Sequence, residues 1–152
     1  MTQALSFDIG KKNFAFLLEE FDEEKMSQTK NTPLNKRYNP NGTCTIEFER
    51  ILEEIFKNGT KILLKNIDLT HETKTDKYFD TDILYNLFEV LNERKIFFEK
   101  VSVVIIEKQM SFKGKINTMA LIIAAATMSW FMIHFGRSLQ VIEFPHSIRV
   151  RF

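Results

Sequence analysis

The chain has 152 residues, of which 44% are hydrophobic and 27% charged, and its net charge is +1. These values are typical of one soluble globular domain covering residues 1–152, and they exclude a uniformly basic surface, so any surface for nucleic acid must be local. The single cysteine, Cys44, excludes an internal disulfide and suits a reducing, intracellular compartment.

The first part of the chain predicts a hairpin followed by a loop. Residues 4–8 form a short apolar run that ends at Gly10, which is typical of a strand, and residues 13–20 predict its antiparallel partner. Residues 22–43 are polar and rich in Asn, Pro and Gly. This composition is typical of a long surface loop.

The middle of the chain predicts a helix, a strand and a second helix. Residues 45–57 begin with a strand-like alternation but carry apolar side chains at helical spacing, so we expect a helix there. Residues 61–68 are predicted to form a strand. Residues 80–98 have the clearest helical pattern, with an apolar stripe along one face.

The last part of the chain predicts a buried strand, an apolar helix and a final strand. Residues 101–107 are rich in β-branched side chains, which is typical of a parallel strand buried on both faces. Residues 116–136 contain no Asp, Glu, Lys or Arg and are long enough to span a bilayer. Their Asn, Thr, Ser and His residues favour a helix buried in the fold or in a dimer interface, not a membrane span. Residues 138–144 are predicted to form the last strand.

Strands that first pair locally and then alternate with helices predict an α/β fold with a mixed sheet and flanking helices. Two of these strands, 4–8 and 101–107, end in an acid, Asp8 and Glu107. If they are parallel neighbours, both carboxylates emerge at the carboxyl edge of the sheet, where open α/β sheets bind ligands.

A pair of close carboxylates is a candidate catalytic metal site. Their mutual repulsion is relieved by a hard divalent cation such as Mg²⁺ or Mn²⁺. The alternative for Asp8 is a turn residue that bonds locally to the backbone before glycine, and for Glu107 an ordinary carboxylate in solvent.

Basic residues follow both acids, where the phosphates of a DNA backbone would need them. Phe112 lies among them and could stack on a base or wedge between bases. The alternative is a solvated lysine-rich loop. The candidate DNA-binding residues are Lys11, Lys12, Lys108, Phe112, Lys113 and Lys115.

Two motifs, LSFDIGKKNFAF and VVIIEKQM, resemble those of the RuvC-like Holliday junction resolvases of the RNase H-like superfamily. The poxvirus and large-DNA-virus branch is the most similar, and fungal mitochondrial resolvases are more distant. The residues that carry the resemblance are Ser6, Asp8, Ile9, Gly10, Lys12, Asn13, Ile106, Glu107, Lys108 and Gln109.

The resemblance implies a homodimeric, Mg²⁺-dependent endonuclease that cuts four-way DNA junctions. Asp8 and Glu107 would be catalytic metal ligands, and the helix 116–136 would lie at the dimer interface, with no membrane involved. A viral member would act at the replication site in the host cytoplasm.

One departure from the family concerns its last helix, which carries two further acids. No acid follows Glu143 here, so we expect an RNase H-like fold that lacks the final helix. The chain could be truncated, could take a ligand from residues 68–82 or from Glu143, or could be a weak or inactive nuclease. The alternative function is therefore a non-catalytic dimer that binds junctions.

Overall fold

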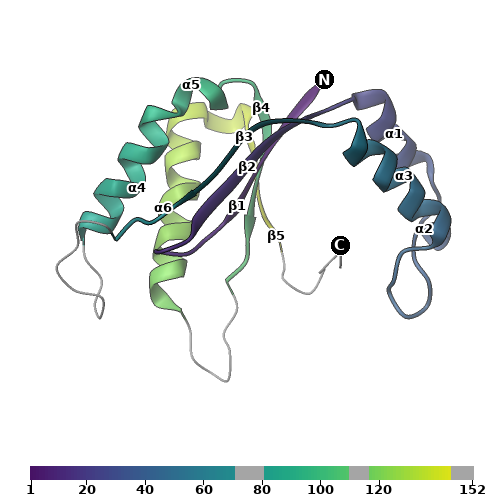
Figure 1. Ribbon diagram of the computed structural model, residues 1–152, viewed down its shortest axis with the longest axis horizontal. Coiled ribbons are helices and arrows are strands. Elements are labelled where there is room, and N and C mark those ends of the chain that lie inside the picture. The colour runs from purple at the N-terminus through teal and green to yellow at the C-terminus, as the bar shows by residue number, and fades with distance from the viewer. Residues whose placement is uncertain (71–80, 110–116, 145–152) are drawn as a thin grey trace.

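Five strands form one mixed sheet in the order β3-β2-β1-β4-β5 in the computed structural model, which describes residues 1–70, 81–109 and 117–144 (Figure 1). β1 and β3 are antiparallel to β2, which lies between them, and β4 is parallel to both β1 and β5. This mixed sheet with helices packed against it confirms the predicted α/β class. The strands are β1 (Thr2–Asp8), β2 (Phe14–Phe21), β3 (Thr60–Ile67), β4 (Val101–Glu107) and β5 (Gln140–Phe144).

The helices form two groups. Figure 1 shows α4, α5 and α6 together on one side of the sheet, with α1, α2 and α3 set apart from them. The first group is α4 (Thr81–Glu93), α5 (Lys95–Phe98) and α6 (Thr118–Phe135), and a short 3-10 helix, η1 (Gly136–Ser138), leads from α6 into β5. The second group is α1 (Glu23–Asn31), α2 (Leu34–Arg37) and α3 (Ile46–Lys57).

The prediction of a long loop over residues 22–43 is wrong for much of this range, because α1 and α2 lie within it. Neither helix has a buried residue, so no apolar periodicity could reveal them. Local capping supports α1 instead, since the Asp22 carboxylate accepts a hydrogen bond of 2.9 Å from the backbone N–H of Glu24. The predicted helix over 45–57 is confirmed as α3, which buries Phe48 and Ile55.

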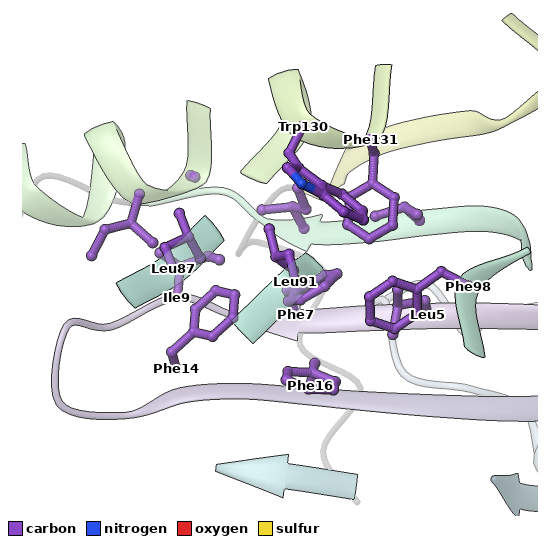
Figure 2. Packing of buried hydrophobic residues seen from close by; sticks show 14 of the residues in the cluster. Leu5, Phe7, Ile9, Phe14, Phe16, Leu87, Leu91, Phe98, Trp130 and Phe131 are labelled. Carbon is purple, nitrogen blue, oxygen red and sulfur yellow. The ribbon is translucent and has the colours of Figure 1, made fainter. Parts of the chain in front are cut away.

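The core lies between the sheet and the group α4, α5 and α6, and aromatic rings dominate it. Phe7 on β1 contacts Phe16 on β2 and Phe131 on α6, with ring centroids 5.5 Å and 5.7 Å away. Figure 2 shows these rings with Phe98 and Trp130 filling the space between strands and helices. Such aromatic contacts add to the free energy gained by burying the rings.

Helix α6 is apolar on both its buried and its exposed face. The buried face follows helical spacing through Ala120, Ile123, Thr127 and Phe131. Ile133 on the outer face is 79% exposed. By length and composition alone, Thr118–Ser138 could cross a bilayer, and about a third of its most apolar stretch is buried inside the fold. Core helices of soluble proteins meet the same criterion.

The pairing of β1 with β4 contains one irregularity. Gln3 pairs with Val101, but the next pair is Ala4 with Val103, so β4 has one more residue than β1 at this point. Pairing is then regular as far as Phe7 and Ile106. The extra residue is a β-bulge, and Ser102 at this position is exposed.

We expect Phe131→Ala to lower the free energy of unfolding by about 3–5 kcal/mol, because it removes a buried ring and leaves a cavity. Urea denaturation followed by circular dichroism measures this loss. The control is Glu53→Ala at an exposed position of α3, which should change stability by less than about 0.5 kcal/mol. Equal losses in the two variants would contradict the assignment of the core.

Candidate metal and phosphate site at the carboxyl edge of the sheet

Asp8 and Glu107 end two neighbouring parallel strands at the same edge of the sheet. The last paired residues are Phe7 and Ile106, and Asp8 and Glu107 are the next residue on each strand. Because Phe7 and Ile106 both point into the core, alternation along a strand directs Asp8 and Glu107 to the opposite face. Adjacent strands are about 4.8 Å apart, so the register brings the two predicted site residues together. Asp8 is exposed and Glu107 partly buried.

The turn from β1 to β2 carries Lys11 and Lys12. Gly10 suits this turn because a Cβ atom there would lie 3.2 Å from the carbonyl oxygen of Asn13, closer than most side chains tolerate. Lys11 is partly buried and Lys12 is exposed. The two lysines predicted to bind phosphate therefore lie in the turn that directly follows Asp8 at the carboxyl edge of the sheet.

A buried hydrogen-bonded chain, not predicted from the sequence, anchors this turn. The backbone N–H of Leu69 donates to the carbonyl of Lys11 at 2.8 Å. The Asn86 side chain on α4 donates to the carbonyl of Leu69 at 2.8 Å. Leu69 is fully buried and Asn86 is 9% exposed. The sequence signal for this contact was the polar Asn86 itself, which lies within the apolar stripe of α4, three residues after the buried Ile83.

The residues after Glu107 are attached to β5. The backbone N–H of Lys108 donates to the carbonyl of Phe144 at 2.9 Å. The Lys108 ammonium lies 4.0 Å from the Glu143 carboxylate. The Gln109 side chain donates to the carbonyl of Glu107 at 3.3 Å. The chain therefore continues the edge of the sheet for a short distance past the end of β4.

Glu143 does not supply the third carboxylate of the site. It pairs with Ile106 across the parallel strands, and paired residues point to the same face of a sheet. Ile106 is fully buried beneath the helices, so Glu143 lies on the face opposite to Asp8 and Glu107. The possibility that Glu143 joins them as a ligand is not supported by this register.

Asp68 also lies at the carboxyl edge, because β3 ends at Ile67, which pairs with Phe14 at the start of β2. Its carboxylate accepts hydrogen bonds from the backbone N–H of Thr70 at 2.8 Å and from the Thr70 hydroxyl at 2.6 Å. This local pattern is an Asx turn. Residues 71–80, which make up most of the 68–82 region considered as an alternative source of a ligand, lie outside the described residues.

The carboxylates at this edge suit one hard cation. Mg²⁺ often uses only one or two protein carboxylates and completes its coordination with water and substrate phosphates. Asp8 and Glu107 fit that donor set. Within residues 1–70, 81–109 and 117–144, no group of three or more His, Cys, Asp or Glu side chains could hold a metal ion. The described part of the chain thus offers ligands for one ion and not for two.

Three further predicted DNA-binding residues, Phe112, Lys113 and Lys115, lie outside the described residues. Their role stays a prediction. Among the described residues, the basic side chains predicted for the site are Lys11 and Lys12 after β1 and Lys108 after β4.

No family model and no curated protein matches this chain. Among solved structures, it is similar to the fowlpox virus Holliday junction resolvase, at 17% identity and a TM-score of 0.45 over 95% of this chain and 61% of that one. It is also similar to the yeast mitochondrial Holliday junction resolvase Ydc2, at 13% identity and a TM-score of 0.45 over 95% of this chain and 53% of that one. The chain therefore spans less than two thirds of either protein's length.

We expect Asn86→Ala to destabilise the turn that carries Lys11 and Lys12, because it leaves the buried carbonyl of Leu69 without its side-chain donor. An unsatisfied buried acceptor costs about 1–3 kcal/mol. Amide hydrogen exchange at Leu69 should become faster, together with a lower free energy of unfolding. Glu89→Ala, at an exposed position of the same helix, is the control and should change neither.

Proposed function

We propose that this protein is a metal-dependent endonuclease that cleaves phosphodiester bonds in four-way DNA junctions. The observation that carries the proposal is the pairing of β1 with β4, which puts Asp8 and Glu107 side by side on one face at the carboxyl edge. Lys11 and Lys12 follow Asp8 in the turn after β1, and Lys108 follows Glu107 at the end of β4. The motif resemblance to resolvases supports the same assignment.

Asp8 and Glu107 would hold a Mg²⁺ or Mn²⁺ ion. When bound, the ion would act as a Lewis acid that stabilises the negative charge developing on the phosphate oxygens. The lysines of the β1–β2 turn would attract and orient the phosphates of the strand to be cut. The anchoring of that turn through Leu69 and Asn86 would keep those lysines at a fixed distance from the carboxylates.

The test is cleavage of a synthetic four-way junction with Mg²⁺. We expect Asp8→Asn and Glu107→Gln each to lower the cleavage rate about 100-fold or more, because each removes a ligand of an ion that contributes several kcal/mol to the reaction. Junction binding should persist in both variants. Glu49→Gln, an exposed acid on α3, is the control for loss of one negative charge.

A second candidate function is a non-catalytic protein that binds junctions. It is favoured because the described part of the chain brings together no group of three or more acidic, His or Cys side chains that could hold a metal ion. Binding of the junction by the unaltered protein without cleavage, in either Mg²⁺ or Mn²⁺, would support this alternative and contradict the nuclease assignment. Cleavage that survives both Asp8→Asn and Glu107→Gln would contradict the assignment of these two acids as metal ligands.

We also propose that the protein is a homodimer through α6. The outer face of this helix exposes Ile133 by 79%, Met132 by 55% and Leu121 by 39%. Beside it, α4 and α6 border a groove of about 330 Å³ that includes Phe88 and Trp130. A second copy of α6 would remove this apolar surface from water, and a resolvase that cuts symmetrically needs two copies.

We expect Ile133→Glu to convert the dimer to a monomer, since it puts a charge into an apolar interface. Light scattering after size-exclusion chromatography measures the mass. Leu34→Glu is the matched control, because Leu34 is 72% exposed on α2, away from the proposed interface. A monomeric unaltered protein, or a dimer that tolerates Ile133→Glu, would contradict the proposal.

A further inference from the structure

Lys108 and Glu143 form an ion pair across the ends of β4 and β5. Glu143 Oε2 lies 4.0 Å from Lys108 Nζ, with side chains 40% and 60% exposed respectively. Two features bring them together. The backbone N–H of Lys108 donates to Phe144 at 2.9 Å, and Glu143 is level with Ile106, two residues before Lys108. The backbone of both strand ends therefore holds the two charges near each other.

The pair lies on the other face of the sheet from the two carboxylates of the candidate site. Ile106 and Glu143 share the face that the helices cover, and alternation puts Lys108 there too. Asp8 and Glu107 point to the opposite face. Glu143 thus attracts the ammonium of Lys108 toward β5, although Lys108 directly follows Glu107 in the chain.

We propose that Glu143 is a positioning residue that holds Lys108 while DNA is absent and competes with a DNA phosphate for it. This inference rests on the proposed function, because it requires DNA at this edge. The 4.0 Å separation is longer than a hydrogen bond, and the ammonium is well exposed. Such an exposed pair is weak enough to be exchanged for a phosphate.

The exchange has a consequence that binding can measure. When DNA takes Lys108, the protein loses the ion pair, and this loss cancels part of the affinity that Lys108 contributes. In a Glu143→Gln protein there is no ion pair to break, so DNA binding no longer has this cost. Lys108 should therefore contribute more to affinity when residue 143 is neutral than when it is Glu.

The test is a double-mutant cycle of Lys108→Gln and Glu143→Gln. Equilibrium binding to a fluorescein-labelled four-way junction is measured by anisotropy in EDTA, so no cutting occurs. We expect Glu143→Gln to tighten binding. Lys108→Gln should then weaken binding by a factor about 1.5–5 times larger in the Glu143→Gln protein than in the unaltered one, the size of an exposed ion pair.

The salt dependence supplies a second readout that a structural role would not change. In the Glu143→Gln protein, Lys108→Gln should reduce the slope of log K against log salt by about 0.9, the value for one phosphate contact. Glu49→Gln controls for loss of a negative charge elsewhere, and Glu143→Thr gives a second neutral variant suited to a strand. Urea midpoints verify that every variant is folded.

An equal effect of Lys108→Gln in both backgrounds would overturn the proposal, because Glu143 would then act only through its general charge. No effect of Lys108→Gln in either background, or no DNA binding by any of the proteins, would also overturn it. The cycle needs no metal and no cleavage. A protein that binds but fails to cut junctions would therefore contradict the nuclease function while leaving this inference intact.

Discussion

The side-by-side burial of Phe7 and Ile106 is the constraint on which the candidate site depends. Both residues lie in the core that α6 covers, where Phe7 also meets Phe131. Side chains alternate along a strand, so the residue after each of them has to point away from the core. The position of Asp8 and Glu107 on one open face thus follows from hydrophobic packing one residue earlier.

The sequence predicts the parts of the fold that are stabilised by buried apolar side chains. The strand over 101–107 has the bounds of β4, and the apolar helix within 116–136 corresponds to α6. The helices within 22–43 could not be predicted in this way, since α1 and α2 bury nothing. Their hydrogen bonds are local, and a polar segment with Asn and Pro has the same composition whether it forms short capped helices or a loop.

The site shows the same division. Asp8 and Glu107 could be predicted because each ends an apolar run, and the pairing of their strands makes them neighbours. For contacts between distant segments no pattern identifies the partner, although Asn86 stands out as a polar residue within the apolar stripe of α4. The bond from Asn86 to Leu69 joins α4 to the residues after β3, and the pairing of Lys108 with Glu143 depends on the register of β4 with β5.

The single extra residue in β4 changes the face of the sheet to which each later side chain of this strand points. If β4 continued in the register of Gln3 with Val101, Asp8 would lie level with Ile106, and Glu107 would turn its carboxylate beneath the helices. The extra residue at Ser102 moves Glu107 to the solvent side, six residues from the bulge's start at Val101. Insertion or deletion of one residue between this irregularity and Glu107 would therefore move the Glu107 carboxylate from the open face of the sheet into the hydrophobic interior.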